Sequence, residues 1–181
     1  MDSSGDGAIL DFDLGELGML ARSGPDRDVD SRQPSEVEAA FEATLAEFDR
    51  RVAAAGKTAT FCVFRVGFGP RCSETVKTVV RTRTFQKMER STREGDLCLR
   101  CPNGDVLLAL TGCDVESARK SITLMMKLFT VENVHGPDDE LKMSAGIAPY
   151  SGSAQAAQRT ALLACDLASF QDNGYIEVVE F

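Results

Sequence analysis

The sequence lacks Trp, contains a single His and has no excess of positive charge. Lys and Arg total 20 against 28 Asp and Glu in 181 residues, which gives a net charge of −8. This charge repels phosphate backbones and excludes non-specific DNA or RNA binding, although a small anion can still bind where arginines cluster. The single histidine, His135, lies in the polar stretch 131–140, predicted to be a surface loop, so we expect no His-based catalytic site.

Long apolar segments are also missing. No run approaches the ~20 residues that a membrane span needs, and no basic segment followed by an apolar one opens the sequence, so we predict neither a span nor a signal peptide. We therefore expect a cytoplasmic protein with reduced thiols. Cys98 and Cys101 have the spacing of a zinc or redox pair, but in a strand they point to opposite faces, which favours two apolar strand residues.

The first 33 residues are rich in Asp, Ser, Gly, Arg and Pro and are predicted to be a disordered acidic tail. Residues 8–21, AILDFDLGELGMLA, differ because they mix acidic residues with large apolar ones. This segment is either a frayed part of the tail or a short docking segment that becomes ordered on a protein partner.

Residues 34–56 are predicted to form an amphipathic helix. Ser35 and Glu38 have the spacing of a capping box, and Gly56 is a typical stop. An apolar stripe recurs at helical spacing, at Val37, Phe41, Thr44, Leu45, Phe48 and Val52. The helix either covers the domain that follows or pairs with a second copy of the chain in a homodimer.

Residues 57–181 are predicted to form one domain in which strands and helices alternate. The strands are predicted at 58–69, 97–101, 105–111, 141–149 and 174–181, and the helices at 73–91, 115–130 and 153–170. Asp114 and Ser153 are the expected caps of the second and third helices. The order β-α-β-β-α-β-α-β, with a hairpin inside it, predicts an α/β (α+β) fold of ferredoxin-like type, with helices around a mostly antiparallel sheet.

The stretch 73–91 is ambiguous by itself. Ser73 can cap a helix whose inward face holds Val76, Val80 and Met88, yet part of the stretch also alternates like a strand. A strand of that length is unusual, so a helix is favoured.

Three stretches occur in an informative order: TREGDLCLRCPNGDVLLAL (92–110), LKMSAGIA (141–148) and LLACDLASF (162–170). Over residues 58–181 they resemble the GGDEF domain of bacterial diguanylate cyclases, which make cyclic di-GMP from two GTP molecules. The resemblance implies the palm-like fold of class III nucleotide cyclases.

The signature of this family is degenerate here, because its five positions hold Pro102, Asn103, Gly104, Asp105 and Val106. Gly104 stands where the resemblance places a metal-binding acid, and Asp105 keeps one carboxylate. Aligning the preceding strand puts Phe64 and Val66 at acidic positions, so apolar side chains are expected where Mg²⁺ would lie. We therefore expect no cyclase activity and no Mg²⁺ cofactor, and we favour reading Asp105 as a turn residue.

The pair Arg93 and Asp96 matches the Arg-x-x-Asp motif that, in the family, forms an inhibitory site for cyclic di-GMP. An arginine fork suits phosphate or the guanine Hoogsteen edge, and a carboxylate accepts from guanine N–H groups. Arg90 and Arg100 are expected to add positive potential. The alternatives are a solvated ion pair worth about 0–1 kcal/mol, or a motif retained without binding.

The first hypothesis is a non-catalytic signalling protein that binds cyclic di-GMP and regulates a protein partner, through residues 8–21 or the helix from Ser35. The second is an interaction scaffold that has lost nucleotide binding. The third is an enzyme with residual GTP binding at Asp105.

Overall fold

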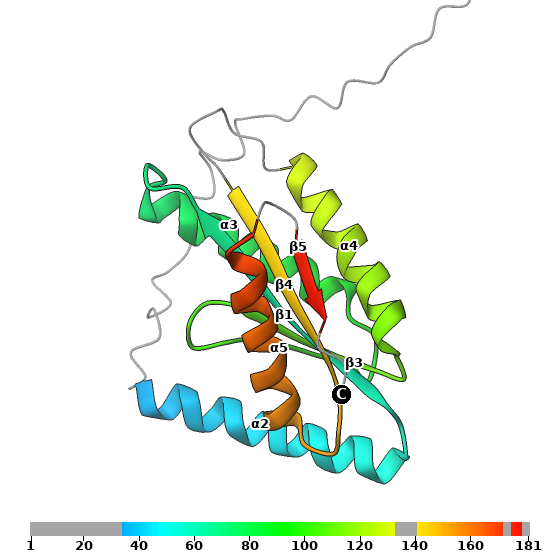
Figure 1. Ribbon diagram of the computed structural model, residues 1–181. Helices are drawn as coiled ribbons and strands as arrows, with labels where there is room; N and C mark the ends of the chain where they lie inside the picture. Colours follow the sequence, from blue (N-terminus) through cyan, green and yellow to red (C-terminus); the bar gives the residue numbers. More distant parts are fainter. Residues whose placement is uncertain (1–33, 133–140, 172–174, 179–181) are drawn as a thin grey trace, which may run out of the picture. The chain divides into compact units, whose positions relative to one another are not determined.

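The centre of the fold is a five-stranded sheet, seen in a computed structural model that describes residues 34–132, 141–171 and 175–178 (Figure 1). The strands are β1 (Ala59–Phe68), β2 (Leu97–Arg100), β3 (Val106–Thr111), β4 (Leu141–Pro149) and β5 (Tyr175–Val178). Their order is β2-β3-β1-β4-β5, and all neighbours are antiparallel except β4 and β5. The mostly antiparallel sheet is therefore confirmed, whereas the expectations for the tail 1–33 and for His135 lie outside the described residues.

Helices cover both faces of this sheet (Figure 1). They are α2 (Pro34–Ala55), α3 (Glu74–Ser91), α4 (Val115–Glu132) and α5 (Ala154–Ser169). Helices α2 and α5 pack on one face, and α3 and α4 pack on the other. Among these described helices, none is both long and apolar enough to cross a bilayer.

The predicted caps of α3, α4 and α5 are confirmed. The hydroxyl of Ser73 accepts from the backbone N–H of Val76, and the hydroxyl of Ser153 accepts from that of Ala156. A carboxylate oxygen of Asp114 accepts from the N–H of Ser117 at 2.7 Å. Each contact satisfies one of the N–H groups that a helix start leaves without an intrahelical partner.

Strand β1 is apolar along most of its length because both of its faces are buried. Phe61 and Val63 face α2 and α5, whereas Cys62, Phe64 and Val66 face α3 and α4. The strand pleat sends alternate side chains to opposite faces, so a one-residue shift would exchange the two sets.

Helix α2 covers its own domain, as the first of the two alternatives predicted. Leu45, Phe48 and Val52 are buried, and a carboxylate oxygen of Asp49 accepts from the N–H of Ala154 at 2.6 Å, at the start of α5. The helix begins at Pro34, so Ser35 is its second residue and not the residue that precedes it. Pairing with a second copy stays a prediction.

Two details of the other helices differ from the expectation. Val80 and Met88 face the core with Thr84, but Val76 is 37% exposed because the packed part of α3 begins only at Val80. Helix α4 continues to Glu132 and so includes the first two residues of the predicted loop 131–140.

Backbone contact between α5 and β4 depends on Gly146. A Cβ atom at this position would overlap with the backbone of Ala161 and Cys165. The facing side of α5 is built from small residues, Ala154, Ala157, Ala161, Ala164 and Ala168, all buried. Gly146 and these alanines therefore let a helix and a strand approach each other more closely than larger side chains would permit.

Replacing Gly146 by Ala should destabilise the protein by at least about 3 kcal/mol, because the added methyl meets rigid backbone. Urea unfolding of the purified chain measures the change. The matched control is Gly67→Ala in β1, where a Cβ would lie 3.4 Å from the Cβ of Lys142, an ordinary contact. An unchanged urea midpoint for Gly146→Ala would contradict the close approach.

Candidate functional site

The turn between β2 and β3 is closed by its own hydrogen bonds. The N–H of Cys101 donates to the carbonyl of Asp105 at 2.8 Å, and the N–H of Gly104 donates to the carbonyl of Cys101 at 2.9 Å. Gly104 has a φ of +86°, a conformation that favours glycine. The side-chain oxygen of Asn103 accepts from the N–H of Asp105 at 3.1 Å. Backbone and side-chain hydrogen bonds therefore both stabilise the turn.

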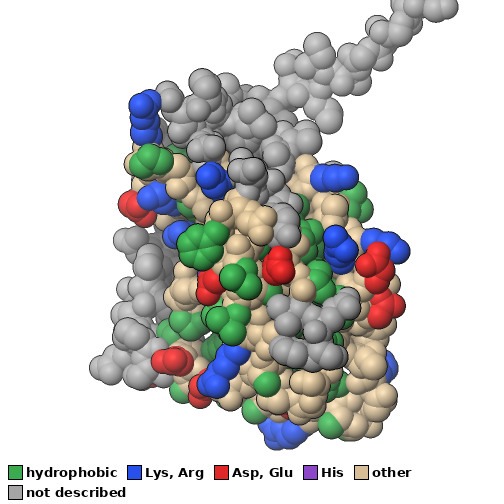
Figure 2. Space-filling model, viewed as in Figure 1, with side chains coloured by type: hydrophobic (Ala, Val, Ile, Leu, Met, Phe, Trp, Pro, Cys, Tyr) green, Lys and Arg blue, Asp and Glu red, His purple; other side chains and the backbone are tan. Residues whose placement is uncertain are grey.

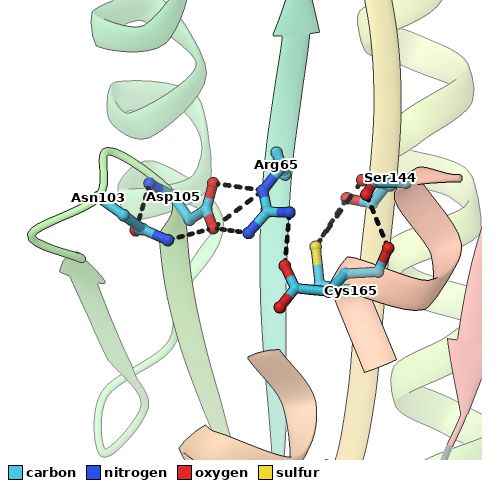
Figure 3. A network of polar contacts seen from close by, with 7 residues as sticks. Arg65, Asn103, Asp105, Ser144 and Cys165 are labelled. Atoms are coloured by element: carbon cyan, nitrogen blue, oxygen red, sulfur yellow. Dashed lines mark hydrogen bonds and ion pairs between the residues drawn. The ribbon is translucent and has the colours of Figure 1, made fainter. Parts of the chain in front are cut away.

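The carboxylate of Asp105 faces Arg65 in β1 (Figure 3). The Nε of Arg65 donates to Oδ1 at 3.0 Å and its Nη2 donates to Oδ2 at 2.7 Å, which is a bidentate pair. The amide of Asn103 also donates to Oδ2, at 2.7 Å (Figure 3). Asp105 is only 6% exposed, so its charge is compensated by protein groups more than by water.

The same guanidinium reaches a second carboxylate. The Nη1 of Arg65 donates to Oδ1 of Asp166 in α5 at 2.6 Å. Hydrogen bonding to Asp105 raises the pKa of Arg65, burial acts against this, and hydrogen bonding to Asp166 raises the pKa further. Arg65 therefore stays charged and joins β1, the hairpin turn and α5.

Phe64 and Val66 lie on the side of β1 that α3 and α4 cover. Both side chains belong to the core under α3 and α4, with Phe64 1% exposed. Because strand residues alternate, the neighbour between them, Arg65, takes the position that faces Asp105. A guanidinium therefore lies against Asp105, and the expectation of apolar side chains where Mg²⁺ would lie stays a prediction.

Sequence reasoning missed Arg65, although one signal was present. It is the only charged residue in the ten-residue strand β1, whose other side chains are apolar apart from Thr60 and Gly67. A charge inside such a strand needs a partner of opposite sign, because charged groups are rarely buried alone.

Arg93 and Asp96 lie in the loop between α3 and β2. One carboxylate oxygen of Asp96 accepts from the N–H of Arg93 at 3.0 Å, and the other accepts from the N–H of Thr111 at 2.9 Å. The hydroxyl of Thr111 donates to the carbonyl of Gly95 at 2.8 Å. Asp96 therefore fastens this loop to the end of β3 and makes no ion pair with Arg93.

The side chain of Arg93 is exposed and has no hydrogen bond or ion pair with any residue that the structure describes. Arg90 is also exposed, in the last turn of α3 just before this loop. Arg100 lies at the far end of β2, with its guanidinium 4.9 Å from the ring centroid of Phe85. Arg90 therefore lies beside the loop that holds Arg93. Arg100 lies near the β2–β3 turn, because the four residues of β2 separate it from the loop by roughly 10 Å.

Cys98 and Cys101 point to opposite faces, as predicted. Cys98 packs with the core under α3 and α4, and Cys101 belongs to the core under α2 and α5. Burial raises the pKa of each thiol to about 12, so both are protonated near neutral pH. Within residues 34–132, 141–171 and 175–178, no three His, Cys, Asp or Glu side chains are grouped so as to hold a metal ion.

No protein-family model matches the sequence, and no curated protein matches it. Solved structures do match. The coiled coil and GGDEF domain of DgcB from Caulobacter crescentus, in complex with c-di-GMP, has a TM-score of 0.65 at 10% identity, covering 78% of this chain and 80% of that one. The active GGEEF domain of a diguanylate cyclase from Vibrio cholerae has a TM-score of 0.60 at 12% identity, covering 77% and 96%.

A third similar structure is the diguanylate cyclase SiaD in complex with its activator SiaC, from Pseudomonas aeruginosa. Its TM-score is 0.65 at 16% identity, with 92% of this chain and 66% of that chain covered. These identities are low, so the likeness concerns the path of the chain and not its chemistry. The described part of the chain has the fold of GGDEF domains, the palm-like fold of class III nucleotide cyclases.

Proposed function

We propose that the chain is a non-catalytic signalling protein that binds cyclic di-GMP at Arg93 and Asp96 and regulates a protein partner. The observation that carries the proposal is the loop between α3 and β2, in which Asp96 is fixed by two backbone N–H groups beside an exposed Arg93 without a partner among the described residues. A fixed carboxylate next to an available guanidinium is preorganised for a ligand that carries both phosphate and guanine.

Asp96 keeps capacity for a ligand. An ionised carboxylate offers about four acceptor positions, and the N–H groups of Arg93 and Thr111 use two of them. Arg93 has a planar set of donors suited to phosphate or to the guanine Hoogsteen edge. Structures similar to this fold have been solved with c-di-GMP bound, which supports the same class of ligand here.

Arg65 supports the proposed absence of catalysis. Two-metal phosphoryl transfer needs carboxylates that are available to Mg²⁺. Here both oxygens of Asp105 accept from Arg65, and Asn103 donates to one of them as well. A fixed positive charge thus lies against the carboxylate that a divalent cation would need, and electrostatic repulsion disfavours a second cation there.

The second candidate is a nucleotide-independent interaction scaffold with the same fold. Large apolar side chains remain at the surface on α5 and at the residue after it: Leu163 is 64% exposed, Leu167 57% and Phe170 87%. Hydrophobic side chains are visible on the face of the molecule that Figure 2 shows. Exposed apolar side chains gathered on one helix are typical of surfaces that contact other proteins. This reading requires no ligand at Arg93.

Titration calorimetry with cyclic di-GMP should show binding in the micromolar range for the full chain. Arg93→Ala should weaken it at least about tenfold, because the phosphate and guanine contacts of the guanidinium are lost. Asp96→Asn should weaken it as well, since the amide keeps an acceptor for the loop but loses the charge.

The matched control is Arg119→Ala, which removes an exposed cation from α4 and should leave the affinity unchanged. The absence of heat with the wild-type chain would favour the scaffold instead. Binding that survives Arg93→Ala would place the dinucleotide elsewhere on the protein.

Incubation with GTP and Mg²⁺ or Mn²⁺ should yield no cyclic di-GMP, because Asp105 is engaged by Arg65. Chromatography with mass detection measures the product. Turnover that disappears in Asp105→Asn would establish an enzyme, and the proposal of a non-catalytic protein would fail.

Arg65→Met should lower the free energy of unfolding by about 3–5 kcal/mol, because Asp105 is left buried without its counter-charge. Arg100→Met is the matched control, since it removes an exposed arginine that stacks on Phe85, and it should cost about 1 kcal/mol or less. Thermal and urea unfolding of both variants report the difference. Equal losses in the two would show that Arg65 has no special structural role.

A further inference from the structure

Helix α5 carries a stripe of exposed side chains on its outer side. Arg159, Leu163, Leu167 and Phe170 follow one another at intervals of four, four and three residues, so they share one side of the helix. The two leucines and Phe170 are each more than half exposed. Their apolar surface is on the order of a few hundred Å², the size at which an exposed patch marks contact with another molecule.

The distribution of large and small side chains on α5 is the reverse of what a solvent-facing helix usually shows. The inner side is built from alanines that lie against β4, whereas the large apolar side chains point outward. Phe170 follows the last turn, but its backbone stays helical, with φ −80° and ψ −9°, so its side chain continues the stripe. The apolar side chains that would normally pack on the helix's own domain are thus available to another molecule.

The stripe is complementary to itself when two copies of α5 run antiparallel. If a two-fold axis passes midway between Leu163 and Leu167, Leu163 of one copy faces Leu167 of the other, and symmetry repeats the contact. The same register brings Phe170 of one copy next to Arg159 of the other, because the two residues lie at opposite ends of the stripe. A guanidinium over an aromatic ring is a favourable contact. Every residue of the stripe therefore meets a partner of suitable chemistry.

The charges on α5 favour the antiparallel arrangement over the parallel one. Arg159 is exposed and has no ion pair with any residue that the structure describes. Antiparallel pairing places it at the C-terminal end of the other helix, where the carbonyl groups carry negative partial charge and the last turn has no basic residue. The two arginines then lie roughly 18 Å apart along the helices, beyond the Debye length at physiological salt. Asp166, the one acidic residue of α5, is already paired with Arg65. Parallel pairing would put the two copies of Arg159 side by side.

We infer that the outer side of α5 is the interface of a two-fold homodimer of this chain, in which the two α5 helices are antiparallel and touch through Leu163, Leu167 and Phe170. One pair of helices buries less than the roughly 1,600 Å² of a standard interface, so the dimer dissociates in the micromolar range. Arg93 and Asp96 lie in the loop between α3 and β2 and take no part in the contact. The dimer therefore forms without cyclic di-GMP, and the inference does not depend on the proposed function.

Sedimentation velocity of the full chain without nucleotide, from low to several hundred micromolar, should show a monomer–dimer equilibrium. Leu163→Lys and Leu167→Glu should each raise the dissociation constant of the dimer at least about tenfold, because a charge would be buried without a partner. Leu124→Glu is the matched control, since Leu124 is 60% exposed on α4, and it should leave the dissociation constant unchanged. Arg93→Ala should leave it unchanged as well. Circular dichroism and melting temperature verify that each variant is folded.

An equimolar mixture of the Leu163→Lys and Leu167→Glu chains tests the direction of the helices. In the antiparallel register the introduced lysine faces the introduced glutamate and the two unchanged leucines face each other, so the mixture should dimerise at least about tenfold more tightly than either variant alone. Three results would overturn the inference: a wild-type chain that stays monomeric over the whole range, a dimer that both leucine substitutions leave intact and that therefore uses another surface, or a mixture that dimerises no better than its components.

Discussion

The guanidinium of Arg65 lies between two carboxylates, and the arrangement of this end of the fold depends on it. Asp105 belongs to a turn and Asp166 to a helix more than fifty residues later, and both are bonded to the same side chain of the central strand. Charges in a partly buried position are tolerated when each one has a partner with good geometry. One guanidinium consequently links the turn, β1 and α5.

The β2–β3 hairpin has two ends with different properties. At the turn, Asp105 is enclosed by Arg65 and Asn103 and has little contact with solvent. At the other end, Asp96 is bonded to backbone while Arg93 extends into solvent. The hairpin therefore has at one end a carboxylate, Asp105, that is hydrogen-bonded within the protein, and near its other end a guanidinium, Arg93, that is exposed to solvent.

Local patterns in the sequence were sufficient for the elements and for a mostly antiparallel sheet. Ser73, Asp114 and Ser153 cap helices through contacts three residues along the chain, so spacing alone predicted them. The sequence alone could not predict that Arg65 pairs with Asp105, because the pair depends on the register of β1 against β3, where Phe64 lies opposite Val106. A shift of one residue in this register would turn Arg65 to the opposite face of the sheet, away from Asp105.

The contacts of Asp96 also depend on residues that are distant in the sequence. Its offset from Arg93 was visible in the sequence, but its bond to Thr111 joins residues that only the fold brings together. Where the spacing indicated a pair of charged side chains, the structure has a carboxylate bonded to backbone N–H groups beside an exposed guanidinium that has no partner among the described residues. The sequence motif singled out Arg93 and Asp96, but only the tertiary contacts show which groups Asp96 binds.

The seam between α5 and β4 has a mechanical consequence. Because Gly146 brings the strand against the backbone of the helix, only small side chains of α5 lie between the two elements there. Sliding of one past the other would force main-chain atoms into collision, which disfavours movement of α5 relative to β4. On the opposite face of the sheet, α3 and α4 rest on longer and more deformable side chains such as Met88 and Met126.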